Sequence, residues 1–94
     1  MTAYMIVQSV ITDKERYGSY REAVVPLIEA FGGKHVRGGK VALLEGQQDE
    51  RRIALFEFPS IEAIYAFWNS PDYVPVKELR RGAATLEIWA VPGI

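Results

Sequence analysis

The chain has 94 residues, enough for one domain with a single core, and 49% of them are apolar while 12% are aromatic. With 11 Lys and Arg against 12 Asp and Glu, the formal net charge is −1, which argues against a dedicated nucleic-acid binder because such domains are normally basic. Cysteine is absent, and this excludes disulfides, thiolate nucleophiles and cysteine-ligated metals.

Residues 4–11 form the first predicted strand, and apolar side chains occupy both of its alternating faces. One face carries Tyr4, Ile6 and Val10, and the other carries Met5, Val7 and Ile11. A strand of this kind is covered on both sides, so we expect the sheet that it joins to be covered twice.

A helix is predicted to follow this strand. Thr12 and Glu15 have the spacing of a capping box, in which the Thr12 hydroxyl accepts a hydrogen bond from the amide of Glu15. Apolar residues then recur at steps of three and four over residues 17–31, and the glycine pair at 32–33 ends the helix. Pro26 lies inside this pattern, so we expect a kink or a weakened turn there.

The middle of the chain favours two more strands. Residues 34–36 and 40–45 favour strand, interrupted by a bulge or sharp bend at the glycine pair 38–39, because glycine tolerates backbone angles that other residues avoid. Residues 46–50 are predicted to form a hairpin loop, and residues 52–58 the next strand.

Two capped helical segments are predicted after this strand. Ser60 is placed to cap the first, because its hydroxyl can accept a hydrogen bond from an amide of the first helical turn. Ser70 and Pro71 repeat the arrangement and begin a second segment over about residues 71–81, whose regularity Pro75 limits.

A last strand over residues 86–91 gives the order β-α-β-β-α-β. This order is typical of an α+β, ferredoxin-like fold with one antiparallel sheet and the helices on one face, and residues 1–94 form one such domain. The helices cover only one face of the sheet, whereas the strands carry apolar side chains on both faces. Pairing of two sheets in a homodimer would cover the second face and enclose a barrel-like core between the subunits.

Short motifs spread over nearly the whole chain carry a family resemblance. They are Ala3-Tyr4, Tyr17 with Tyr20, Gly32-Gly33, Arg37-Gly38-Gly39, Leu44-Glu45-Gly46, Arg52, Glu57-Phe58-Pro59-Ser60, Trp68 with Ser70-Pro71 and Tyr73, and Arg80. By these motifs the chain resembles the small bacterial proteins of the domain of unknown function 1330 (DUF1330) family. That family belongs to the dimeric α/β-barrel superfamily, which also holds cofactor-independent monooxygenases and muconolactone isomerases. The resemblance implies this fold and a dimer, but no reaction, because none is established for the family.

Three polar residues lie in strands that otherwise favour burial: Gln8, Glu57 and Glu87. The first strand of this topology lies between the third and the fourth, so these side chains would meet if the registers agree. A carboxylate beside another carboxylate, or in an apolar pocket, has a raised pKa suited to general acid or base catalysis. The alternative is that each lies near the rim of the sheet, in water or paired with an arginine.

Arg37, Arg52 and Arg80 are the natural counter-charges. An arginine near a pocket can hold a carboxylate ligand through two parallel hydrogen bonds. The alternative for each is a salt bridge to Glu45 or Glu57. A single Arg-Gly-Gly motif in an acidic chain does not indicate RNA binding.

Aromatic residues fall on the predicted helices at spacings that direct their rings inward: Tyr17, Tyr20, Tyr65, Trp68 and Tyr73. Such rings either line a cleft with their hydroxyls as polar groups or simply pack in the core, and core packing is the favoured interpretation for Trp68. His35 is the only imidazole and could act as a proton shuttle, although a partly exposed strand histidine is the plainer interpretation. One histidine without cysteine argues against a zinc site.

We therefore expect a small cleft in each protomer, lined by Tyr17, Tyr20, Arg37, Glu57, Trp68 and Tyr73. In the enzyme hypothesis, Glu57 or His35 removes a proton from a small organic acid or aromatic compound held by Arg37, with no cofactor and no metal. In the alternative hypothesis, the dimer is a non-catalytic module that binds a metabolite or partner, and the polar residues only fix the strand register.

No stretch of the sequence approaches the roughly 18 apolar residues of a membrane span, and the first residues lack the pattern of a secretory signal. We expect a cytoplasmic protein whose partners are a second copy of the chain and a small molecule, without membrane or nucleic-acid contact.

Overall fold

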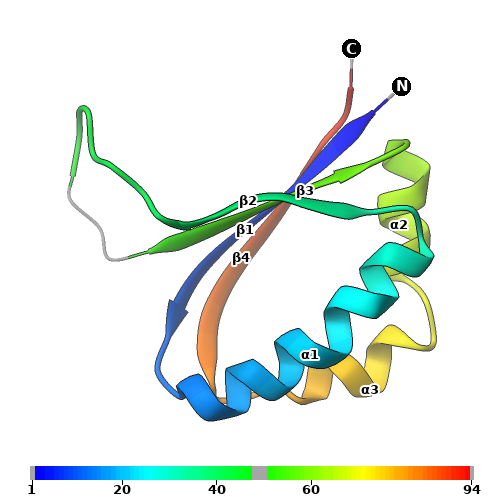
Figure 1. Cartoon of the computed structure of the whole chain (residues 1–94), viewed down its shortest axis with the longest axis horizontal. Helices are drawn as coiled ribbons and strands as arrows, with labels where there is room; N and C mark the ends of the chain where they lie inside the picture. Colours follow the sequence, from blue (N-terminus) through cyan, green and yellow to red (C-terminus); the bar gives the residue numbers. More distant parts are fainter. Residues whose placement is uncertain (1, 48–50, 94) are drawn as a thin grey trace.

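The computed structural model describes residues 2–47 and 51–93. Its elements, in chain order, are β1 (Ala3–Ile11), α1 (Lys14–Ala30), β2 (Lys34–Lys40), β3 (Arg52–Phe58), α2 (Ile61–Trp68), α3 (Tyr73–Glu78) and β4 (Ala84–Val91) (Figure 1). The predicted ferredoxin-like order is confirmed, with the second helical region divided into α2 and α3. No helix within the described residues is long and apolar enough to cross a membrane.

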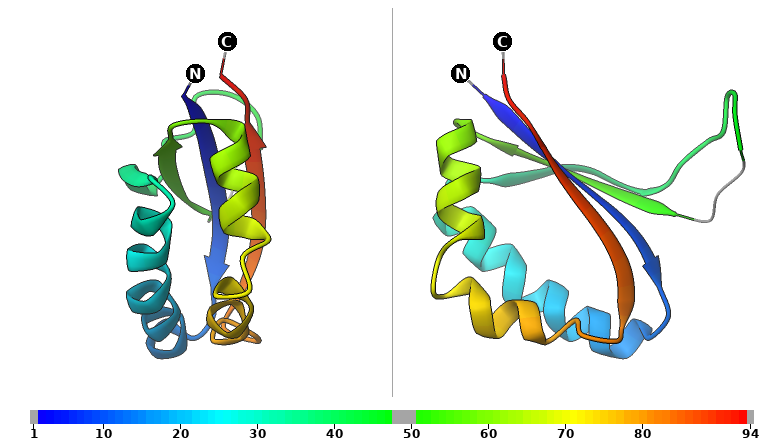
Figure 2. Two further views of the ribbon diagram at one scale, coloured as in Figure 1. Left: turned by 90° about the vertical axis from the view of Figure 1, so that its right-hand side faces the viewer. Right: turned by 180° about the vertical axis from the view of Figure 1, so that it is seen from behind.

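The four strands form one antiparallel sheet in the order β2-β3-β1-β4. All three helices lie on the same side of this sheet (Figure 2). Val7 of β1 stands opposite Ala54 of β3 and Ile88 of β4, and these three residues face the helices. The core lies between the two layers, where Phe58, Phe67 and Tyr73 are the largest fully buried side chains. The side of the sheet that packs against the helices is its helix face, and the opposite side is its open face.

The start of α1 differs from the predicted capping box. Asp13 is the N-cap, and its carboxylate accepts a hydrogen bond from the Arg16 amide at 3.1 Å. Thr12 instead donates from its amide and its hydroxyl to the carbonyl oxygen of Ala83, at 2.9 and 3.1 Å. The capping-box prediction for Thr12 and Glu15 is wrong because Thr12 joins the end of β1 to the start of β4. The helix then continues through Pro26 to Ala30.

The predicted end of α1 at the glycine pair is confirmed. Gly32 adopts a left-handed φ of 85°, which glycine accepts without a steric penalty. The Gly32 amide donates to the carbonyl of Glu29 at 3.0 Å, and the Gly33 amide donates to the carbonyl of Ile28 at 2.9 Å. These two bonds form a Schellman motif, which satisfies carbonyls at the helix end and turns the chain into β2.

The second strand is continuous, contrary to the prediction. It spans Lys34–Lys40, and its register against β3 shifts between His35 and Arg37 rather than at the glycine pair. The predicted strand over 40–45 is also wrong, because Lys40 pairs with the first residue of β3 and the next residues have no described strand residue opposite. Residues 41–47 project away from the body of the molecule (Figure 1). The predicted loop at 46–50 falls partly outside the described residues.

The two caps near the C-terminal helices have different outcomes. Ser60 caps α2 as predicted, since its hydroxyl accepts from the Ala63 amide at 3.1 Å. The Ser70 hydroxyl also accepts, from the Asp72 amide at 3.1 Å, but α3 begins only at Tyr73 and ends at Glu78. The prediction of a helix over 71–81 is too long, because the residues on either side form turns.

Candidate functional site

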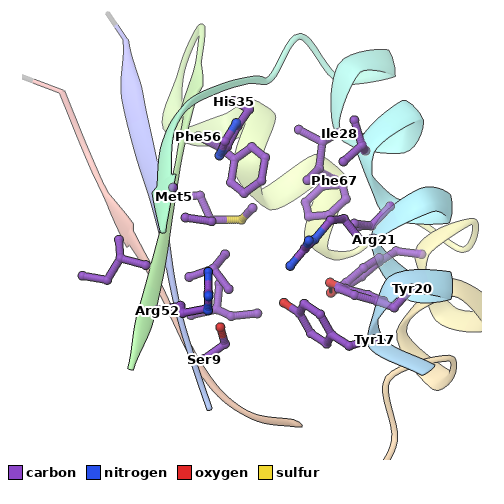
Figure 3. Close-up of a pocket in the computed structure, with 18 of the residues that line it drawn as sticks. Met5, Ser9, Tyr17, Tyr20, Arg21, Ile28, His35, Arg52, Phe56 and Phe67 are labelled. Atoms are coloured by element: carbon purple, nitrogen blue, oxygen red, sulfur yellow. Dashed lines mark hydrogen bonds between the residues drawn. The ribbon is translucent and has the colours of Figure 1, made fainter. Parts of the chain in front are cut away.

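A cavity of about 350 Å³ lies between α1 and the helix face of the sheet (Figure 3). Strand alternation directs Met5, Val7 and Ser9 into it, and helical spacing directs Tyr17 and Tyr20 toward them. Phenylalanine and tryptophan side chains from β3 and α2 complete its apolar wall. The cavity therefore has the character of a small-molecule site, with apolar walls and a few polar groups.

Two tyrosine hydroxyls meet at the cavity wall. The hydroxyl oxygens of Tyr20 and Tyr73 lie 2.9 Å apart, and both residues are buried. Burial raises the pKa of the Tyr20 hydroxyl, and the neighbouring Tyr73 raises it further. Burial also raises the pKa of the Tyr17 hydroxyl, although the nearby guanidiniums of Arg21 and Arg80 oppose that shift. Tyr17 and Tyr20 therefore stay protonated at neutral pH and can donate hydrogen bonds.

His35 lies at the rim of this cavity. Its ring packs on Phe56, with the ring centroids 5.2 Å apart. Gly38 makes room for the imidazole, because a Cβ at that position would lie 2.8 Å from His35 Nε2. His35 is exposed, and its ring faces the cavity.

Trp68 also lines the cavity. Its ring lies 5.3 Å from that of Tyr73, measured between centroids, and the Lys77 ammonium lies 4.5 Å from its centre. Tyr65, in contrast, points outward and is 57% exposed. Of the aromatic residues singled out from the sequence, Tyr17, Tyr20, Trp68 and Tyr73 are thus brought together around one space, and Tyr65 is not.

Glu57 and Arg37 lie on the open face of the sheet and do not line the cavity. Glu57 stands opposite Tyr4, and its carboxylate lies 3.5 Å from the Lys34 ammonium. Arg37 stands opposite Leu55. Sequence alternation contained this signal, because Glu57 lies between two phenylalanines that face the helices.

The predicted meeting of three polar strand residues is fulfilled for two of them. Gln8 stands directly opposite Glu87 on the open face, and Arg51 joins them. The Arg51 guanidinium donates to the Gln8 side-chain oxygen at 3.2 Å and to the Glu87 carboxylate at 2.7 Å. Glu57 lies farther along β3, because Gln8 pairs with Ile53. The alternative interpretation, pairing with an arginine, therefore fits Glu87, whereas Glu57 pairs with a lysine.

Two arginines line the cavity, Arg21 on α1 and Arg52 on β3. Arg52 is among the residues that the sequence pattern predicts for the site, whereas Arg21 is not. Arg21 follows Tyr17 by one helical turn, and its guanidinium lies 5.4 Å from the centre of the Tyr17 ring. Arg80 lies 5.5 Å from the centre of the Tyr20 ring, and its Nε is buried without a hydrogen-bond partner among the described residues. No group of three or more metal-ligating side chains occurs in residues 2–47 and 51–93.

Comparison with solved structures identifies the fold. The chain superimposes on a protein of unknown function from Rhodopseudomonas palustris with a TM-score of 0.79 and 24% identity, covering 99% of this chain and 82% of that one. SnoaB, a cofactor-independent oxygenase from Streptomyces nogalater, gives a TM-score of 0.71 at 13% identity, covering 99% and 93%. A dimeric protein of unknown function with a ferredoxin-like fold from Bacteroides fragilis gives 0.58 at 15% identity, covering 98% and 96%.

At these identities the structural matches establish the fold alone. A search of curated proteins finds no match. The family model for the domain of unknown function DUF1330 matches residues 2–94, nearly the whole sequence. The chain therefore belongs to the DUF1330 family.

Proposed function

We propose that the cavity between α1 and the sheet binds a small organic acid or aromatic compound and transforms it by acid/base chemistry without a bound cofactor. The observation that carries this proposal is the cavity itself, where an imidazole and tyrosine hydroxyls open onto one apolar space of about 350 Å³. The fold shared with SnoaB, a cofactor-independent oxygenase, supports chemistry of this kind.

In the proposed reaction, His35 removes a proton from the bound molecule, because its imidazole lines the cavity and histidine is the side chain that most often acts as a general base. One hydroxyl of the Tyr20 and Tyr73 pair donates to the other, which leaves the second O–H free to donate to the ligand. A hydrogen bond aimed at an oxygen that gains negative charge stabilises the anion formed when the proton leaves. Tyr17 supplies a second donor on the same wall.

We also propose that the protein is a homodimer in which a second copy covers the open face. Strand alternation directs Tyr4, Ile6 and Leu55 to that face, with Trp89 from β4 beside them. Trp89 is 57% exposed, which is unusual for a large aromatic side chain in the middle of a strand. The similar structure from Bacteroides fragilis is described as dimeric, which supports this assembly.

A non-catalytic small-molecule-binding module is the second candidate. One observation favours it: among the described residues that line the cavity, His35 is the only imidazole and no carboxylate accompanies it. In that case the tyrosines and arginines fix the position of a ligand, and no proton is transferred.

A ligand screen followed by turnover assays separates the two candidates. Compounds that raise the melting temperature are incubated with the protein and analysed for conversion, because a ligand that binds only the native state stabilises it. We expect His35→Gln to retain binding and to lower turnover about a hundredfold or more. Glu57→Gln is the matched control, since its carboxylate lies on the open face, and it should leave turnover unchanged.

The outcomes decide between the hypotheses. If the wild-type protein binds several screened compounds and converts none, the binding module is correct. If His35→Gln keeps full turnover while Glu57→Gln loses it, the assignment of His35 as the base is wrong and Glu57 takes its place.

A further inference from the structure

Two arginines face the same opening of the cavity from opposite layers. Arg21 projects from α1, and Arg52 lies on the facing strand β3 (Figure 3). Both residues also line an adjoining hollow of about 360 Å³ toward the start of α1, where Lys14 adds a third positive charge. Ser9 and Tyr17 line both spaces as well, so the hollow adjoins the cavity, and we call this shared side the entrance.

No carboxylate lines either space among the described residues. Arg21 and Arg52 form no ion pair within residues 2–47 and 51–93, whereas Arg81 is paired with Glu78 at 2.9 Å. Like charges facing one opening repel each other, and an anion between them removes that repulsion. The entrance is therefore built for a negative group, whereas the interior is not.

The interior beyond the arginines is apolar and aromatic. Phe56 is 8% exposed and Phe67 is 1% exposed, and Met5 lies between β1 and these rings. An apolar ring fits such a space, because removing its surface from water contributes roughly 25 cal/mol per Å². The cavity thus joins an apolar chamber to a cationic entrance.

We infer that the ligand is an aromatic monocarboxylate whose ring occupies the chamber and whose carboxylate binds between Arg21 and Arg52. This inference rests on the proposed function of the same cavity and names its substrate class. A guanidinium offers two parallel N–H donors to a carboxylate, and two guanidiniums from opposite walls satisfy both of its oxygens. The ring then lies against Met5, Phe56 and Phe67, and the acid group stays at the entrance.

A matched pair of probes tests the role of the charge. The first probe, 2-naphthoate, has an aromatic ring and a carboxylate, and 2-naphthamide has the same ring and a neutral group of similar size. We expect the wild-type protein to bind the naphthoate more tightly than the amide by about tenfold or more, measured by isothermal titration calorimetry, because hydrogen bonds to charged groups are the stronger ones.

Three variants locate the effect. Arg21→Gln and Arg52→Gln should each weaken binding of the naphthoate by about tenfold to a hundredfold and change binding of the amide less than about threefold. Arg81→Gln is the matched control, because it removes the same charge outside the cavity, and it should change neither affinity. All three side chains are exposed or half-buried, so melting temperatures should show that each variant is folded.

Failure of this inference is distinguishable from failure of the proposed function. If the amide binds as tightly as the naphthoate, or if Arg21→Gln and Arg52→Gln weaken both probes equally, the arginine clamp is wrong although the cavity still binds aromatic molecules. If neither probe binds at millimolar concentration while other compounds do, the aromatic monocarboxylate assignment is overturned. If no compound of any class binds, both the proposed function and this inference are wrong.

Discussion

Alternate side chains of each strand point to opposite faces of the sheet, and the two faces lie in different environments. On the helix face, Phe58 is fully buried and Met5 is 3% exposed. On the open face, Trp89 is 57% exposed and Val91 is 41% exposed, although both are large apolar residues in a regular strand. Period-two alternation therefore tells which residues share a face, whereas a single chain provides helices for only one of them.

The polar chemistry is divided between the faces as well. The cavity over the helix face is lined by tyrosine hydroxyls, an imidazole and two guanidiniums that form no ion pair within the described residues. The open face carries the carboxylates of Glu57 and Glu87, each beside a cation. The cavity is consequently suited to an anionic ligand, and the open face to a partner that tolerates paired charges among apolar residues.

The largest expected effect comes from a substitution in the core that packs against the helix face. Phe67 contacts the rings of Phe58 and Tyr73, with centroids 6.0 and 4.7 Å away, and is 1% exposed. Phe67→Ala should lower the free energy of unfolding by about 3–5 kcal/mol, because it leaves a cavity in the core. Urea denaturation at one protein concentration measures the change. Tyr65→Ala on the same helix is the control, since its ring is exposed, and a loss below about 1 kcal/mol in Phe67→Ala would contradict the packing described.

The next largest effect is on dimer formation, from a substitution on the open face that leaves the core of the single chain intact. Trp89→Glu places a charge in the proposed dimer interface and should raise the dissociation constant of the dimer about a hundredfold or more. Sedimentation equilibrium should then show a mass near 10.6 kDa for the variant and twice that for the wild type. Tyr65→Glu, on an exposed helical surface, should remain dimeric. If the wild-type protein sediments as a folded monomer, the homodimer proposal is wrong.

Two glycines at α1 have different surroundings, one tightly packed and one open, so adding a methyl group should have opposite effects on stability. A Cβ on Gly33 would lie 2.5 Å from Ile28 Cγ2 and 2.7 Å from Phe58 Cζ, so Gly33→Ala should destabilise the protein by about 1–3 kcal/mol. Gly18 lies inside α1, and beyond its chain neighbours and the local helix backbone no atom lies within 4 Å of its would-be Cβ, so Gly18→Ala should stabilise by about 0.5–1 kcal/mol. Thermal melting should therefore shift in opposite directions, and a shift of the same sign in both variants would contradict the structure.

The smallest effect concerns the buried phenols at high pH. Burial raises the pKa values of Tyr17 and Tyr20 in the folded protein. Above pH 10 the unfolded chain has lost protons that the folded protein keeps, so stability falls as pH rises. Tyr20→Phe should make this fall shallower, by up to ~1.4 kcal/mol per pH unit. Urea midpoints between pH 8 and 11 measure the slope, and the exposed Tyr65→Phe should keep the wild-type slope. Equal slopes for the wild type and Tyr20→Phe would show that Tyr20 is not buried as described.

Much of the fold could be predicted because local patterns determine it. The helical spacing of Tyr17 and Tyr20, the cap at Ser60 and the glycine pair at the end of α1 each act over a few residues. Thr12 was misassigned because its partner, Ala83, lies 71 residues away in the sequence. Contacts of that kind depend on strand pairing, which local spacing does not specify.

The candidate site was predicted less completely than the fold. The tyrosines could be grouped because helix periodicity places them on one side of α1. Glu57 was grouped with them although its place between two phenylalanines directs it to the other face. Arg21 was missed because a charged residue on a helix is ordinarily solvated, and only the gap between α1 and β3 makes it face Arg52. The gap itself is a tertiary property that no local pattern encodes.

The central claim is that small molecules bind between α1 and the helix face of the sheet, and Met5 reports on that space most directly. Met5 is 3% exposed, lines the cavity and is one of two methionines in the chain. In protein labelled with ¹³C at the methionine methyl groups, titration with 2-naphthoate should shift the Met5 resonance until it saturates at the concentration found by calorimetry. A Met5 resonance that stays in place while calorimetry records saturable binding would contradict the claim, because the ligand would then occupy another part of the molecule.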